Sequence, residues 1–242
     1  LVGVANRLEE IRGELQAEYP NINVKIIGFS KMIGDVSNGA KQVVMFFGIA
    51  FVITAFLVYF YSHSINLTLL PLLCSVVAVI WQLGLLTSLG FGLDPMSILV
   101  PFLVFAIGVS HGVQMINAVG RNVASGTSSA DAAYGACCRL FLPGMIALLS
   151  DTIGFLTLLF IKIDIIKELA ITASLGVAVI ILTNLILLPV LLSYAKFPKN
   201  FAQKVEESGK KQALLWKFFS GFAQPRTAAK TLLVALVIVI VA

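Results

Sequence analysis

The sequence predicts a mainly α-helical fold: a polytopic bundle of transmembrane helices that follows the end of an exported α+β domain. Hydrophobic residues make up 59% of the 242 residues and charged residues only 12%, about half the ~25% charged residues of a soluble domain. The mean hydropathy is +0.98. Between Gln42 and Gly120 there is no Lys or Arg, and Asp94 is the only acidic residue. This composition excludes a soluble globular enzyme.

Residues 1–39 are the polar part of the chain. Apolar residues recur there at helical spacing between charges, which predicts an amphipathic helix; they are Val4, Leu8, Ile11 and Leu15. Tyr19-Pro20 ends this helix, and the alternation of apolar and polar residues over 22–26 predicts a half-buried strand. A helix, a turn and a strand are too little for a domain. We therefore expect residues 1–39 to be the end of a larger, periplasmic α+β porter domain.

Residues 40–194 are predicted to form a five-helix transmembrane bundle. The continuously apolar spans cover about 43–61, 67–90, 96–119, 140–161 and 169–193. Each is long enough to cross a bilayer as a helix, and in lipid a helix satisfies its own backbone hydrogen bonds. A basic cytoplasmic linker is predicted over 195–228, and the start of a further transmembrane helix over 229–242. Part of the linker, 199–222, fits either an amphipathic helix on the inner leaflet or a plain cytosolic connection.

The basic residues predict the orientation. One set of loops comprises 62–66, 120–139 and 194–230, and the other comprises 91–95 and 162–168. The first set contains ten Lys and Arg and the second only two. Positively charged loops stay in the cytoplasm, so we expect a multi-pass protein of the bacterial inner membrane with residues 1–39 in the periplasm. The net charge of +5 is then explained by topology, and no nucleic-acid partner is expected.

Two ionisable residues fall within spans, His111 and Asp151. Such residues are costly in a membrane and usually functional. They lie about 7 and 11 residues from the cytoplasmic ends of their spans, or roughly 11 and 17 Å deep at 1.5 Å per residue. The two spans are antiparallel neighbours, so the groups could meet directly or through a water. Withdrawn from bulk water, they could exchange protons near neutral pH. We predict a proton relay; a hydrogen-bonded pair that only holds two helices together is the alternative.

Further polar groups accompany this pair: Ser110, Gln114, Asn117, Gln82 and Asn184. They predict either a hydrated path through the bundle or interhelical hydrogen bonds. Gly108 and Gly112 form a G-x-x-x-G pattern that would allow another helix to approach closely.

No catalytic constellation, phosphate-binding loop or metal-ligand spacing is visible in the sequence. Ser110 and His111 are neighbours whose side chains diverge on a helix, which argues against a hydrolase pair. We therefore expect no enzymatic activity, no cofactor and no metal.

The chain resembles the N-terminal half of an RND-superfamily exporter of the hydrophobe/amphiphile efflux or MmpL-like type, from helix 2 to the start of helix 7. The motifs that carry the resemblance are Val24–Gly28 with Asp35 downstream, Gly108–His111, Gly126 with Asp131–Ala133, and Leu149–Phe155. The resemblance implies proton antiport and export of lipids or other hydrophobic or amphiphilic cargo. It also implies partners: membrane lipids, the cargo, the second half of the same chain, and periplasmic accessory proteins or further copies of the chain.

The relay motif departs from the family pattern. Ser110 occupies the position at which relatives carry the relay Asp, and His111 replaces an aromatic residue. Asp151 stands where Thr is usual. Either the carboxylate has moved to the neighbouring helix, as in a Ser-His branch of predicted exporters, or proton coupling rests on the second half. Two other functions stay open: a sterol-sensing-like lipid-binding or regulatory module, and a SecD/SecF-like accessory of protein export. Only Arg121 matches the Arg-rich sequence of the latter.

Overall fold

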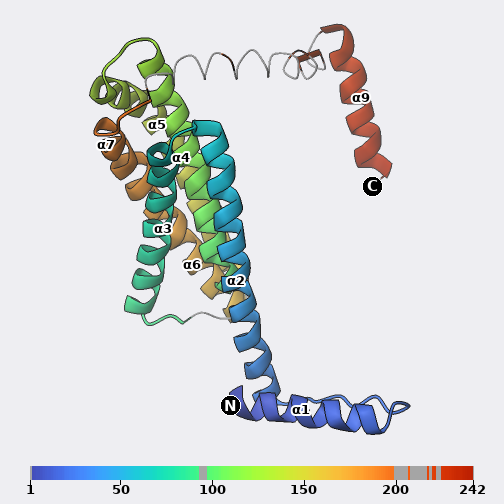
Figure 1. Ribbon diagram of the computed structural model, residues 1–242. Coiled ribbons are helices and arrows are strands. Elements are labelled where there is room, and N and C mark those ends of the chain that lie inside the picture. Colours follow the sequence, from blue (N-terminus) through green and yellow to red (C-terminus); the bar gives the residue numbers. More distant parts are fainter. Residues whose placement is uncertain are drawn as a thin grey trace.

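The computed structural model describes residues 2–92, 97–198, 207, 217, 220–221 and 225–241. In these parts five helices are long and apolar enough to cross a membrane, and no strand occurs (Figure 1). The spans are α2 (Phe29–Ser62), α3 (Ile65–Ser88), η1 (Ser97–Leu99) with α4 (Val100–Ala124), α5 (Ser129–Thr157) with η2 (Leu158–Phe160), and α6 (Asp164–Ile180) continued by η3 (Ile181–Leu187) and α7 (Leu188–Ser193). The predicted helical bundle is confirmed.

The amphipathic helix predicted near the N-terminus is also present, as α1 (Val2–Glu18). It lies across the end of α2 (Figure 1). Lys31 of α2 forms ion pairs with Glu9 of α1 and, at 2.6 Å, with Asp35. Ala5 packs against Gly34 of α2, where a side chain would collide with it. The junction between the polar helix and the first span is therefore held by one lysine and one close helix contact.

The strand predicted over residues 22–26 is wrong. No strand is assigned there. The Gln16 amide nitrogen instead donates to the Ile22 carbonyl at 2.5 Å, and its oxygen accepts from the Val24 N–H at 3.3 Å. A strand needs a neighbouring strand for its ladder of hydrogen bonds. Here a helix side chain supplies two of the bonds, and alternating apolar residues alone did not make a sheet.

The helix α2 begins at Phe29, well before the apolar span predicted to start at residue 43. The added turns contain Lys31, Asp35 and Lys41. A backbone helix continues wherever its hydrogen bonds continue, whereas hydropathy detects only the apolar part. This span therefore extends beyond the apolar stretch toward α1.

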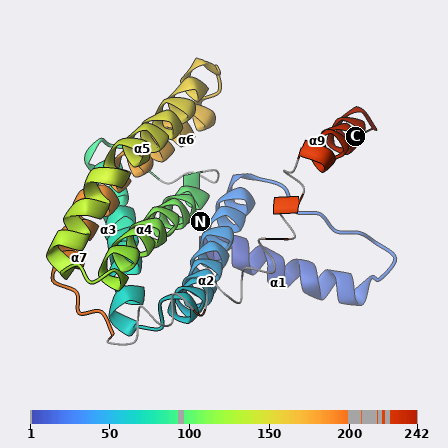
Figure 2. The same cartoon turned by 90° about the horizontal axis from the view of Figure 1, so that it is seen from above.

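The centre of the bundle is formed by α3, α4 and α6. In the most apolar 18-residue stretch of each of these three spans, 44%, 39% and 56% of the residues are buried. The corresponding share is only 6% in α2 and in α5. Two adjoining apolar clusters fill the centre, one around Val104, Phe105 and Val177 and the other around Met115 and Leu188. Viewed from above, α5 and α6 run side by side and α2 lies on the other side of α4 (Figure 2). The α5 helix is thus a peripheral helix that covers α4 and α6.

The α2 helix packs on α4 through aromatic rings. The Phe105 ring centroid lies 5.2 Å from that of Phe47 and 5.6 Å from that of Phe51. At the opposite end from α1, the short turn into α3 is held by a 2.9 Å hydrogen bond between the Ser62 and Thr68 hydroxyls.

After the bundle, α9 (Pro225–Val241) begins with a proline, which suits the first turn of a helix because its N–H would be unpaired there. It includes residues 229–241 of the segment predicted to begin a further span. Most of the predicted linker, including all of the segment 199–222 except residues 207, 217 and 220–221, lies outside the described residues.

Candidate functional site: the polar face between α4 and α5

One side of α4 is a close-packed seam. A Cβ added at Gly108 would lie 2.7 Å from the Ser75 hydroxyl, and one at Gly112 would lie 2.5 Å from the Pro71 Cβ. Asn184 approaches both glycines, with its amide atoms 3.2 and 3.3 Å from the same two added carbons. The G-x-x-x-G pattern thus lies where α4 meets α3 and η3, and only glycine leaves room for these neighbours.

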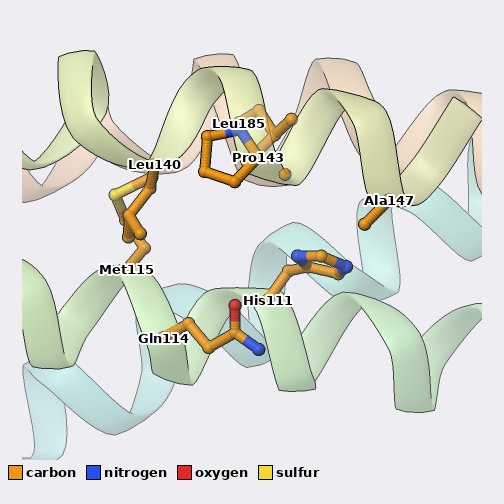
Figure 3. Close-up of a pocket in the computed structure, with 8 residues that line it drawn as sticks. His111, Gln114, Met115, Leu140, Pro143, Ala147 and Leu185 are labelled. Carbon is orange, nitrogen blue, oxygen red and sulfur yellow. The ribbon is translucent and has the colours of Figure 1, made fainter.

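The other side of α4 faces α5 and carries His111. This half-buried side chain lines a pocket of about 170 Å³ between the two helices. Gln114 and Met115 line it from α4, with Pro143 and Ala147 opposite on α5 (Figure 3). Leu185 of η3 closes the back. The imidazole therefore borders a small cavity that has polar groups only on its α4 wall.

Asp151 continues the pocket-lining face of α5. Leu140, Gly144 and Ala147 line the pocket, and Asp151 follows Ala147 by four residues, about 6 Å along the helix. Its side chain is exposed on the bundle surface. No ion pair or hydrogen bond within 4 Å joins Asp151 to His111 in the part of the chain that the structure describes. The structure thus places His111 in the wall of the pocket and Asp151 one helical turn beyond the pocket, without direct contact between them.

The other predicted polar residues divide into two groups. Ser110 and Gln114 are exposed on the α4–α5 side, and Asn117 is half-buried on the same helix. Gln82 and Asn184 are instead fully buried in the centre of the bundle. The structure thus separates an outer polar face from an inner pair.

The inner pair has incomplete hydrogen bonding. Gln82 donates to the Thr172 carbonyl at 3.1 Å, and Asn184 donates to the Thr183 hydroxyl at 3.2 Å. The side-chain oxygens of both amides are buried and accept no hydrogen bond from the residues that the structure describes. Buried oxygens of this kind normally accept a hydrogen bond from an ordered water. Asn184 lies in η3, a π-helical stretch, and π-helices are rare and frequently mark functional sites.

Sequence reasoning did not identify the α5 wall of the pocket. Pro143 lies inside that helix and supplies no N–H, so it interrupts the hydrogen bonding of one turn and loosens local packing. A proline within an apolar span, four residues before Ala147, was the available signal. The helix itself is started by Ser128, whose hydroxyl accepts from the Asp131 N–H at 3.2 Å, as an N-cap does.

Among the residues that the structure describes, no cluster of three or more metal-ligating side chains occurs. The outer polar face nevertheless has a clear physical consequence. A charged carboxylate is strongly disfavoured against hydrocarbon, so a charged Asp151 at this surface requires water or other protein groups around it.

Five spans with ionisable and amide groups at membrane depth define a multi-pass membrane protein of the transporter type. Comparison with known families gives the same class. The MMPL family matches residues 4–230, nearly the whole chain. The chain belongs to the MMPL family, that is, to the RND/MmpL-type exporters. The comparison with curated proteins finds no match.

Proposed function

We propose that this chain is the helix bundle of a proton-driven exporter of lipids or other hydrophobic, amphiphilic molecules. The protein resides in the bacterial inner membrane, and residues 1–39 lie on the periplasmic side. It moves its cargo without a chemical reaction on it. The observation that carries the proposal is the polar face of α4 and α5, where Asp151 is exposed one helical turn beyond the His111 pocket.

The His111 and Asp151 side chains serve as proton-carrying stations. They do not touch, so a proton passes between them through water. The pocket of about 170 Å³ exceeds the roughly 10–15 Å³ that one water needs by this measure. Gln114, which lines the pocket, and Ser110 beside it offer hydrogen bonds to such water. A relay through water also allows a small helix movement to break it, as a coupled transporter requires.

The exposed position of Asp151 also indicates what covers it. A second helix bundle in the same transporter would bury this face and exclude lipid from it. On this account the second half of the exporter is the main protein partner, and the close seam at Gly112 holds α4 while the opposite face moves.

The experiment is a proton-flux measurement, which needs no knowledge of the cargo. The full-length transporter is reconstituted in vesicles that contain a pH-sensitive dye, and a proton gradient is imposed. We expect Asp151→Asn to abolish the protein-dependent flux and His111→Ala to reduce it strongly, with unchanged insertion. Asp131→Asn is the matched control, because it removes a carboxylate from the first turn of the same helix, away from the pocket.

Unchanged flux in Asp151→Asn would refute the relay. The same bundle would then be better explained as a lipid-binding or regulatory module of the sterol-sensing type.

A further inference from the structure

A second cavity lies at the end of the bundle opposite α1. It is a groove of about 370 Å³ where α3 begins and the chain leaves α7, and both views place these two segments together (Figures 1 and 2). Leu69 and Leu70 of α3 form one wall and Leu191 of α7 the other. The walls of the groove are thus made by apolar side chains that would face the acyl region of a membrane.

The mouth of this groove is polar and positively charged. Asn66, Tyr194 and Lys196 line it, and all three are exposed. Lys196 makes no ion pair with any described carboxylate, and none of the described residues that line the groove is acidic. Tyrosine and lysine with apolar side chains beneath them are typical of the membrane–water interface.

We propose that this groove binds one anionic glycerophospholipid. The lipid phosphate lies against the Lys196 ammonium and the Asn66 amide, and one acyl chain lies along Leu70 and Leu191. We expect an anionic headgroup because of the charge at the groove mouth. The ammonium group of a zwitterionic lipid would lie near Lys196 and find no carboxylate among the described lining residues. Anionic lipids are abundant in the cytoplasmic leaflet, and basic pockets between helices on that side suit their headgroups. The predicted orientation places Lys196 there.

The lipid site is separate from the proton pathway. It lies between α3 and α7, whereas the His111 pocket lies between α4 and α5. A bound lipid would link the start of α3 to the chain that leaves α7. Loss of the lipid site would therefore leave the relay groups intact, and failure of the relay would not remove the lipid site.

The test is native mass spectrometry of the full-length protein in detergent with added phosphatidylglycerol or phosphatidylcholine. We expect one tightly held phosphatidylglycerol and no comparable phosphatidylcholine. Lys196→Gln should weaken phosphatidylglycerol binding about fivefold, the effect of removing one basic residue at an anionic membrane surface. Arg121→Gln is the control, because Arg121 is an exposed basic residue outside the groove and its loss should leave binding unchanged.

Three outcomes would overturn the proposal. Equal retention of both lipids would show ordinary surrounding lipid, and an equal loss in the Arg121→Gln protein would show attraction by overall charge. Displacement of the lipid by millimolar inorganic phosphate, with Lys196-dependent phosphate binding, would show a site for a free anion.

Discussion

The close seam between α4 and α3 makes Gly112 a position at which a single methyl group should be costly. In Gly112→Ala the new Cβ would lie 2.5 Å from the Pro71 Cβ and 3.3 Å from the Asn184 side-chain oxygen. Ordinary contacts of this kind begin near 3.4 Å. The proline ring is fixed to its backbone and cannot rotate away, so the two helices must separate.

The expected magnitude follows from two opposing effects. Overpacking a well-packed interior costs about 1–3 kcal/mol. Replacing glycine by alanine within a helix stabilises the folded state by about 0.5–1 kcal/mol. Because a 2.5 Å approach of two carbons is severe, the overpacking cost is expected in the upper part of its range, about 2–3 kcal/mol. The net loss of folding free energy is then about 1–2.5 kcal/mol, which corresponds to roughly 2–10 °C in Tm for a chain of this size.

The assay is thermal unfolding of purified protein in detergent, followed by intrinsic fluorescence. Gly154→Ala is the matched control, because nothing lies within 4 Å of a Cβ added there, and its Tm should be unchanged or slightly raised. If Gly112→Ala unfolds at the wild-type temperature or above, the helices are not held at the separation described, and the argument for the seam fails.

Three further predictions concern the core and the linker. Phe105→Ala should lower the folding free energy by about 3 kcal/mol, because Phe105 is 2% exposed, whereas Phe102→Ala, at a residue 43% exposed, should cost much less; equal Tm losses would contradict the packing. Gln82→Met should change stability by less than about 1 kcal/mol, since interhelical hydrogen bonds in membranes average about 0.6 kcal/mol; a collapse in Tm would show a larger polar network. Reversal of the charges over 199–217 should leave transport turnover mostly intact at normal expression, and a strong fall in turnover would show that this segment takes part in transport.

The five spans could be predicted from the sequence because hydropathy records directly which segments can be placed in lipid. The start of α2 at Phe29 could not be predicted in this way, because its first turns are polar and hydropathy detects only apolar segments. The failed strand over residues 22–26 has a related cause. Alternation shows which side chains can share a face, but the hydrogen-bonding partner, here Gln16, is a property of the folded chain.

The candidate site was predicted only in part for similar reasons. His111 and Asp151 stood out because ionisable residues are rare in spans. That His111 lines a pocket and Asp151 lies one helical turn beyond it depends on the rotation of α5, which no local pattern encodes. The separation of Gln82 and Asn184 from that pocket likewise depends on which faces of α3 and η3 turn inward. The π-helical turns around Asn184 were not predicted, although Pro189 was an available signal, because its missing N–H leaves the Leu185 carbonyl of that stretch without its usual helical donor.

The central claim, that Asp151 carries protons, is tested most directly by infrared difference spectroscopy of the full-length protein before and after a proton gradient is imposed. The account predicts a protonated-carboxyl band that changes with the gradient and is absent from the difference spectrum of Asp151→Asn. The Asp131→Asn protein should keep the band, because that residue lies at the exposed start of α5. A spectrum in which no carboxyl band changes, or in which the band survives Asp151→Asn, would contradict the account.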